Sequence, residues 1–332
     1  MPSNVVRPED SDYLVLFNLD QPFESYCIAQ SCVEKRVPFA IYTLHHKREW
    51  TEKFLNRGTS GAQKWVARAL GGNALRYESV ASFLRNLKHP SVGQILRTRT
   101  ANHMQRYLVS KADTVVTSCS AEARCIEDDT SVSLGRIAVI PHFWNATEGP
   151  VGYSGSAAYA TDLLCAGRIE PRKNQLALAR FVQSSTDRSL LFIGKKNASH
   201  PAYIAELERT IASCPRISWL DHVSKEALYG YLASCGTYIN VSWFEVFSLV
   251  DLIALKSGAR CIFSKGSYLF DELGPSAASG LSFVDPSDLS GLLALLDTAA
   301  ERSLSPIALP ASVSPDPQLL IREWSRVLGA SA

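Results

Sequence analysis

Long apolar runs are missing from this chain of 332 residues. None approaches the roughly 18 consecutive apolar residues that a membrane-spanning helix requires, so the sequence predicts no transmembrane span. The first residues, MPSNVVRPEDSDY, are polar and acidic, which argues against a secretory signal peptide. Internal repeats and low-complexity tracts are also missing. We therefore expect a cytoplasmic protein.

The eight cysteines lack the spacing of a metal-binding or disulfide motif. No C-x-x-C pair and no Cys/His cluster occurs, and most cysteines stand inside apolar runs such as LLCAG and ARCIF. Scattered cysteines of this kind are typical of buried free thiols in a reducing compartment. Disulfides and zinc are the less favoured alternatives.

The composition is that of a soluble globular protein, with 46% hydrophobic and 20% charged residues. The length leaves room for about two domains of ordinary size. A net charge of +2 gives no whole-chain argument for nucleic-acid binding.

Short apolar runs alternate with helical periods along both halves of the chain. The first 46 residues have a strand–helix–strand pattern, and the alternation becomes regular after residue 161. Nearly continuous hydrophobicity within each strand indicates an α/β fold with parallel sheets covered on both faces. We expect two Rossmann-like domains, 1–145 and 162–312, and a Gly/Ser/Ala-rich linker at 146–161.

The loop CAGRIEPRKNQ, residues 165–175, is the first candidate site. A predicted strand ends there, and Arg168, Arg172 and Lys173 precede a predicted helix. Ligands of open α/β sheets bind outside the carboxyl ends of the strands, and a helix N-terminus favours anions. The loop is therefore a candidate diphosphate site, and an ordinary basic loop is the alternative.

The segment VSWFEVFSLVDL, residues 241–252, is the second candidate site. A strand is predicted to end at Ser242 and a helix to begin near Phe247. Its first-turn amides would be unpaired donors at the same sheet edge as the first loop. Glu245 stands just before that helix, and its simpler interpretation is a capping carboxylate.

These two loops, in this order, resemble the retaining GT-B glycosyltransferases of family 4, the glycosyl transferases group 1. The family's G-R-x-x-x-x-K loop corresponds to Gly167, Arg168 and Lys173. Its E-G-F-G-L-x-x-x-E-A-x-A-x-G segment aligns without gaps on 245–258. The matching residues of that segment are Glu245, Phe247, Leu249, Ala254 and Gly258. The resemblance covers most of the chain, closely in the C-terminal half and loosely in the N-terminal half. It implies a C-terminal helix within 313–332, where PQLLIREWSRVL stands.

The resemblance implies that Arg168 and Lys173 hold the donor diphosphate and that Glu245 contacts the transferred sugar. The expected donor-binding residues are Gly167, Arg168, Lys173, Glu245, Val246, Phe247, Ser248 and Leu249. Ile253 stands where the family's second glutamate contacts the ribose, and it cannot form that hydrogen bond. Asp251, about 200° away around the helix, is a poor substitute. Val246 and Ser248 replace the two family glycines.

The family's T-x-H histidine corresponds to His45, with His46 as its rival. The implied role is a polar contact near the reacting carbon of the donor sugar, and a structural histidine is the alternative. The sequence begins where the family's fourth strand would lie. The resemblance therefore implies a trimmed acceptor-side domain, or one in which residues 47–107 replace the early strands.

The segment 47–111 contains thirteen Lys or Arg residues against three Glu residues, with aromatic residues interleaved. Helices of this composition could lie on an anionic membrane surface, where lipid-linked acceptors reside. A solvated basic face, or a cleft wall for an anionic acceptor, is the alternative. Peripheral contact at the cytoplasmic face, through 47–107, is thus one expectation.

The sequence therefore predicts a GT-B-like protein whose two domains face each other across a cleft. It would transfer a sugar, with retention, from a UDP- or GDP-linked donor to a polysaccharide or lipid-linked glycan. The catalytic candidates are Glu245, Lys173, Arg168 and His45. No cofactor and no metal are expected, since no Asp-x-Asp motif occurs in the candidate loops. A catalytically weak subunit or scaffold of a glycan-assembly complex is the alternative, and an epimerase is a more distant one.

Overall fold

The computed structural model of the protein describes residues 8, 11–87, 100–142, 160–274, 280–298 and 317–329. The chain forms two compact units. Unit 1 comprises 1–48, 69–143 and 310–332, and unit 2 comprises 49–68 and 144–309. The expected boundaries remain a prediction, and most of the expected linker, 146–161, lies outside the described residues.

Unit 1 is built on a parallel four-stranded sheet in the order β1-β2-β3-β4. Its strands are β1 (Leu14–Phe17), β2 (Phe39–Tyr42), β3 (Thr114–Thr117) and β4 (Ile137–Val139). Its helices are α1 (Phe23–Lys35), α4 (Ala74–Arg85), α6 (Ala101–Lys111), α7 (Ser120–Thr130) and α14 (Pro317–Val327). The strands are apolar because both sheet faces are covered, as a parallel sheet requires.

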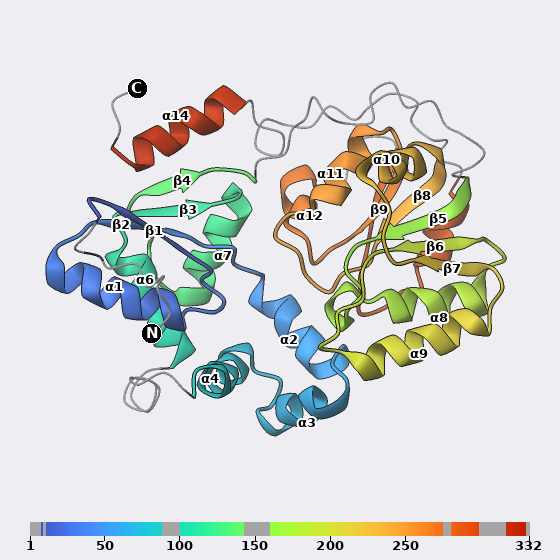
Figure 1. Ribbon diagram of the computed structural model, residues 1–332, viewed down its shortest axis with the longest axis horizontal. Helices are drawn as coiled ribbons and strands as arrows, with labels where there is room; N and C mark the ends of the chain where they lie inside the picture. Colours follow the sequence, from blue (N-terminus) through green and yellow to red (C-terminus); the bar gives the residue numbers. More distant parts are fainter. Residues whose placement is uncertain are drawn as a thin grey trace. The chain divides into compact units, whose positions relative to one another are not determined.

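Two apolar clusters cover the faces of this sheet. Helices α1, α6 and α7 supply one of them, with Ala29, Leu108 and Ile126 packed on the strands. Helix α14 supplies the other through Leu320 and Val327. Figure 1 shows α1 and α6 side by side below the strands and α14 on the opposite face. The C-terminal helix expected within 313–332 therefore belongs to the core of unit 1.

Unit 2 is built on a parallel six-stranded sheet in the order β10-β9-β8-β5-β6-β7. Its strands are β5 (Thr161–Ala166), β6 (Leu190–Ile193), β7 (Ile217–Leu220), β8 (Cys235–Asn240), β9 (Arg260–Ser264) and β10 (Leu281–Val284). Its helices are α8 (Gln175–Ser185), α9 (Pro201–Ala212), α10 (Lys225–Ser234), α11 (Leu249–Lys256), α12 (Tyr268–Leu273) and α13 (Leu292–Asp297), with a 3₁₀ turn at Pro171–Lys173.

The two sheet faces of unit 2 carry different helices. Helices α8 and α9 pack together on the face near β7, and α10 and α11 pack against β5, β8 and β9 from the other face (Figure 1). The order reverses between β5 and β8, which pair directly, Leu163 with Thr237. In doubly wound sheets a reversal of this kind opens a crevice at the carboxyl ends of the two strands.

Helices α2 (Arg48–Arg57) and α3 (Gly61–Ala69) lie between β2 and β3 in sequence, yet 49–68 packs within unit 2. The physical reason is apolar packing, because Trp50 and Phe54 of α2 form a buried cluster with Trp243 and Phe244 of unit 2. The basic segment 47–107 is therefore not one structural body, because α4 and α6 belong to unit 1.

Most sequence-predicted elements are present, with some shifts. Helix α11 was expected to begin near Phe247 and begins at Leu249, because the Ser248 hydroxyl caps it by accepting from the Asp251 amide. The short helix α12 and the 3₁₀ turn were not anticipated.

All eight cysteines are free, and six of them are buried, as expected for scattered thiols. Within the described ranges, no helix is long and apolar enough to cross a membrane.

Candidate functional site

The candidate site lies where the strand order of unit 2 reverses. The loops after β5 and β8 leave the carboxyl ends of neighbouring strands, and a backbone bond joins them, from the Trp243 amide to the Arg172 carbonyl at 2.9 Å. The first loop carries the predicted basic residues and the second carries Glu245. Sequence-distant side chains are thereby brought to one point of the sheet edge, as the topology predicts.

Glu245 and two cations form the centre of this site. Lys173 Nζ donates to Glu245 Oε1, and Arg172 Nη1 lies 3.2 Å from Glu245 Oε2. The Glu245 side chain is 8% exposed, and Lys173 is 16% exposed. Arg172 also donates to the Phe244 carbonyl at 3.1 Å and to Glu170 at 3.0 Å. The site therefore contains alternating positive and negative groups, each with a defined partner.

These contacts set the ionisation of Glu245. Burial alone raises the pKa of this carboxyl group, but the charges of Lys173 and Arg172 lower it to about 2. Burial lowers the Arg172 pKa, and the charges of Glu245 and Glu170 raise it above its ordinary value. Glu245 is therefore a carboxylate and Arg172 a guanidinium at neutral pH, so the first can accept from hydroxyl groups and the second can donate to hydroxyl or phosphate oxygens.

The backbone of Glu245 is fixed by the loop after β9. The Glu245 amide donates to the Gly266 carbonyl at 3.3 Å, and the Tyr268 amide donates to the Glu245 carbonyl at 3.3 Å. Gly266 is required here, since a Cβ at this position would lie 2.1 Å from the Trp243 carbonyl oxygen. The loop that carries the carboxylate is thus held from both sides.

A second carboxylate lies beneath the first. Asp251 is fully buried and accepts from Tyr238 Oη at 2.9 Å and from Asn240 Nδ2 at 2.8 Å. Asn240 Oδ1 in turn accepts from the amide and hydroxyl of Ser242. Burial, and then the negative charge of Glu245, raise the Asp251 pKa to about 6. Because its oxygens bond inside the core, Asp251 is not placed to replace the carboxylate lost at Ile253.

The residues at the start of α11 differ in exposure. Val246 is buried, Phe247 and Ser248 are half-buried, and the Leu249 side chain is 43% exposed. The Ser248 hydroxyl caps the helix, 3.4 Å from the Asp251 amide. Helix α11 thus begins four residues after Glu245, and its capping hydroxyl is turned to the helix backbone.

Gly167 and Arg168 follow β5 at the rim of the site. Arg168 is 67% exposed, and its Nη1 lies 3.9 Å from Glu170 Oε2. It is therefore free to reorient toward solvent at little energetic cost. Of the four predicted catalytic residues, the structure brings Lys173 and Glu245 into contact, with Arg168 in the same loop as Lys173.

His45 belongs to unit 1 and is only 3% exposed. Its Nδ1 lies 2.6 Å from Asp20 and its Nε2 lies 2.8 Å from Asp129. Burial lowers the His45 pKa, but the charge of Asp20 and the bond to Asp129 raise it well above its ordinary value. Both ring nitrogens of His45 therefore have carboxylate partners. The neighbouring His46 is more exposed, at 25%, and its Nδ1 also contacts Asp20.

Glu122 fixes the backbone beneath this histidine. It is fully buried, and it accepts from the His45 amide and the Ser118 amide, both at 2.7 Å. The Thr43 hydroxyl donates to the same carboxylate at 2.6 Å. The loop after β2 is thus held by a buried carboxyl group that no sequence pattern indicated.

One trio in the described ranges could offer three metal ligands: His45, Cys125 and Asp129, whose ligand atoms lie within 4.8 Å of one another. A metal requires a neutral imidazole. Asp20 and Asp129 favour the protonated ring, since both carboxylates bond to it. The trio is therefore better suited to ion pairing than to ligation.

From the sequence, Arg172 was placed in the candidate loop without a role of its own, Asp251 was considered only as a ribose contact, and Asn240 and Ser242 were given no role in the site. Arg172 is adjacent to Lys173 in a loop already read as basic, so its charge was a usable signal. Asp251 and Asn240 are polar residues within apolar runs, which signals a buried hydrogen-bond network.

No protein-family model matches the sequence, and no curated protein does. Solved structures do match along nearly the whole chain. Sucrose-phosphate synthase from Thermosynechococcus elongatus is 14% identical with a TM-score of 0.57, over 97% of this chain and 100% of that one. Anabaena HepE, solved with UDP, is 14% identical with a TM-score of 0.59, over 96% and 100%. The chain has a GT-B fold.

A third GT-B structure agrees with this assignment. The UDP-forming trehalose-phosphate synthase from Burkholderia vietnamiensis is 14% identical with a TM-score of 0.55, over 97% of this chain and 72% of that one. The prediction of an α/β GT-B fold with parallel sheets is thus confirmed. At these identities the likeness shows the fold and leaves family 4 membership as a prediction.

Proposed function

We propose that this protein is a glycosyltransferase that uses a nucleotide-sugar donor. The observation that carries the proposal is the cluster of Glu245, Lys173 and Arg172 at the strand-order reversal of a GT-B sheet. HepE has been solved with UDP-glucose as well as UDP, and it has the same fold. A UDP-linked sugar is accordingly the first donor to test, with a GDP-linked sugar as the second.

In this mechanism Lys173 and Arg168 bind the diphosphate and stabilise the charge that develops as the glycosidic bond breaks. Arg172 holds the Glu245 carboxylate, which orients hydroxyl groups of the transferred sugar. The first-turn amides of α11 add donors for the phosphate. A departing phosphate oxygen accepts the acceptor's proton, so the mechanism retains configuration without a protein nucleophile or a metal.

The proposed acceptor is a polysaccharide or lipid-linked glycan, and the proposed location is cytoplasmic with peripheral membrane contact. The basic composition of 47–107 and the 72% exposed indole of Trp65 support the membrane part. His45 is proposed to act on the acceptor side, at the carboxyl end of β2. Its two carboxylate contacts suit it to shape this loop.

Donor binding and turnover test the proposal. Isothermal titration with UDP-glucose and GDP-mannose should detect one of the two, and slow donor hydrolysis should follow. Lys173→Ala should lower transfer or hydrolysis by about 10²–10³-fold, since it removes a cation from the developing charge. Lys195→Ala, an exposed lysine after β6, is the matched control and should leave turnover unchanged.

One observation favours a second function, a catalytically weak subunit or scaffold. Ile253 offers no ribose contact, and Asp251 is buried elsewhere. The paired cations argue against this second function, because a scaffold does not need Lys173 and Arg172 beside a buried carboxylate. If no donor in a wide nucleotide-sugar panel binds the folded protein, the scaffold would replace the enzyme.

A further inference from the structure

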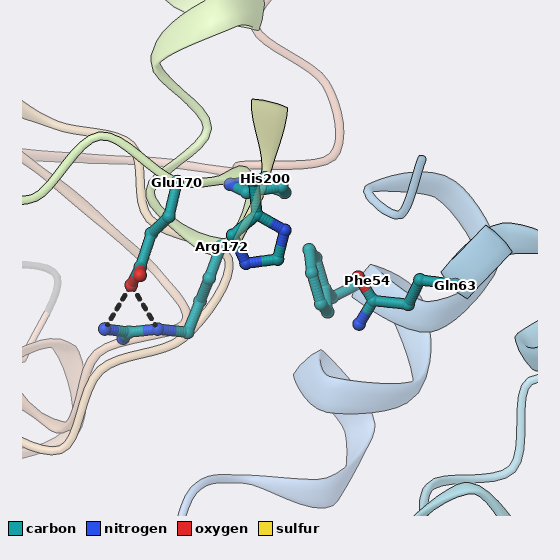
Figure 2. Close-up of a pocket in the computed structure, with 6 residues that line it drawn as sticks. Phe54, Gln63, Glu170, Arg172 and His200 are labelled. Atoms are coloured by element: carbon teal, nitrogen blue, oxygen red, sulfur yellow. Dashed lines mark hydrogen bonds and ion pairs between the residues drawn. The ribbon is translucent and has the colours of Figure 1, made fainter. Parts of the chain in front are cut away.

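A pocket of about 200 Å³ lies in unit 2, beside the cluster just described. Its wall comes from two parts of the chain that are far apart in sequence. The lining residues are Phe54, Gln63, Glu170, Pro171, Arg172 and His200. Figure 2 shows Phe54 and Gln63, from α2 and α3, on one side and Arg172, Glu170 and His200 on the other.

The helical wall of the pocket is fixed by aromatic packing. The Phe54 ring lies 5.6 Å from the Phe244 ring, edge to face, and 6.1 Å from the Trp243 ring. Gly58, at the end of α2, contacts the Trp243 indole so closely that a Cβ there would lie 2.6 Å from Nε1. Since Trp243 and Phe244 directly precede Glu245, the pocket wall and the carboxylate loop are one packed body.

The charges in the pocket cancel. Glu170 Oε1 accepts from Arg172 Nε at 3.3 Å and from Nη2 at 3.0 Å, and its other oxygen accepts from Asn197 Nδ2 at 2.8 Å. The same guanidinium also faces Glu245, with Nη1 3.2 Å from Oε2, so its single positive charge is shared between two carboxylates. A pocket with compensated charges gives no net attraction to a phosphate, and it suits an uncharged polar ligand.

Two lining groups have hydrogen-bonding capacity left over. The Gln63 amide and the His200 ring make no side-chain hydrogen bond within the part of the chain that the structure describes, and both are half-buried. His200 is the residue before α9, but its side chain does not cap that helix. An aromatic ring beside a few convergent polar groups is typical of a ligand pocket.

Arg172 joins this pocket to the donor cluster. It lines the pocket, and its Nη1 lies 3.2 Å from Glu245 Oε2. A ligand in the pocket is therefore separated by one side chain from the carboxylate assigned to the transferred sugar. Reaction between two substrates requires this kind of proximity.

We propose that this pocket is a subsite for an uncharged sugar ring of the acceptor. Within unit 2, α2 and α3 form one wall of the subsite, and the loop after β5 and His200 form the other. The proposal rests on the proposed function. Phe54 packs against the apolar face of the ring, and Gln63 and His200 bond its hydroxyl groups. The acceptor site then includes residues of unit 2 itself.

The test measures sugar binding and donor binding separately on the full chain. Saturation-transfer NMR, with UDP present, would use methyl glycosides of glucose, galactose, mannose and N-acetylglucosamine, and the 6-phosphates of glucose and mannose as charged probes. At least one neutral glycoside should bind, and the phosphates should bind no better. Gln63→Ala and His200→Ala should each weaken that binding about five- to tenfold, as expected for one lost hydrogen bond.

Lys64→Ala, the exposed neighbour of Gln63 on α3, is the control and should bind the glycoside like the wild type. Isothermal titration with UDP should give the same affinity for all variants. No saturable glycoside binding, or unchanged binding in both variants, would overturn the subsite. If Gln63→Ala weakens UDP binding and leaves glycoside binding unchanged, the pocket binds the nucleoside and the acceptor subsite is also overturned. Failure of the wild type to bind any nucleotide would instead contradict the proposed function.

Discussion

At the scale of single residues, the site depends on which groups are buried together. Glu245 and Asp251 lie in one unit, yet their pKa values move in opposite directions, to about 2 and about 6. Glu245 has two cations as neighbours, whereas Asp251 bonds to Tyr238 and Asn240, which are neutral. Environment, and not residue type, decides their charge.

The raised pKa of Asp251 predicts a pH-dependent stability. A carboxyl group whose pKa rises on folding contributes stability that is fully present below its unfolded value, 3.8, and lost as pH rises through about 6. The Asp251→Asn variant has no group that titrates here, so it does not lose this stability as pH rises. In urea unfolding, the free energy of unfolding of the variant minus that of the wild type should increase by about 1–3 kcal/mol between pH 4 and pH 7.

Asp221→Asn, at an exposed aspartate after β7, is the matched control for Asp251 and should show no such trend. Between pH 4.5 and 2 the lowered pKa of Glu245 acts in the opposite sense, because its stabilisation is lost as pH falls. A stability difference for Asp251→Asn that stays flat from pH 4 to pH 7 would contradict the assignment.

His45 gives a second prediction at this scale. His45→Asn leaves the carboxylates of Asp20 and Asp129 without their shared cation. We expect a loss of about 2–3 kcal/mol near pH 6, less than for a fully buried pair, since Asp20 is 28% exposed. The loss should shrink as pH rises through the raised His45 pKa, because that contribution is present only while the ring is protonated.

Chemical denaturation at pH 6 and pH 9 would measure the effect of His45→Asn. His222→Asn, at an exposed histidine, is its control. Equal stability of His45→Asn and wild type at pH 6 would show that the ion cluster does not support unit 1. A change confined to sugar transfer would favour the contact that the resemblance implies.

At the scale of elements, the position of Glu245 depends on the loop after β9 as much as on its own. Gly266→Ala places a Cβ 2.1 Å from the Trp243 carbonyl, so one of the two loops must shift. We expect about 1–3 kcal/mol lower stability, as for overpacked cores, together with weaker donor binding. Thermal unfolding and UDP-sugar titration measure the two effects.

Gly291→Ala is the matched control, because a Cβ there meets nothing within 4 Å. It should unfold and bind the donor like the wild type. Weaker donor binding with unchanged stability in Gly266→Ala would still support the role of the loop. Wild-type behaviour in both assays would show that the contact is relieved without moving Glu245.

At the scale of the whole molecule, the prediction concerns the membrane. Binding to phosphatidylserine vesicles should weaken as salt rises from 50 to 500 mM, since exposed charges are screened. Trp65→Ala should weaken it further, because Trp65 is the most exposed large apolar residue of the described chain. Phosphatidylcholine vesicles are the control. Salt-insensitive or absent binding would reject the peripheral contact.

The basic helices illustrate what a sequence pattern leaves open. The pattern in 47–107 predicts helices and their net charge, but Trp50 and Phe54 are buried against Trp243 and Phe244 while Trp65 is exposed. Periodicity shows that a helix has an apolar face. It does not show which distant part of the chain covers that face.

Local sequence patterns predict the alternation of strands and helices, the parallel sheets, and the two loops that carry Lys173 and Glu245. These features follow from local patterns of apolar, glycine and charged residues, which the chain displays directly. Three features are visible only in the folded chain: Arg172 holds Glu245, Asp251 lies buried behind it, and α2 and α3 line a pocket of unit 2. Arg172 and Glu245 are 73 positions apart, and Phe54 and Phe244 beside the pocket are 190 apart, so their contacts depend on tertiary packing.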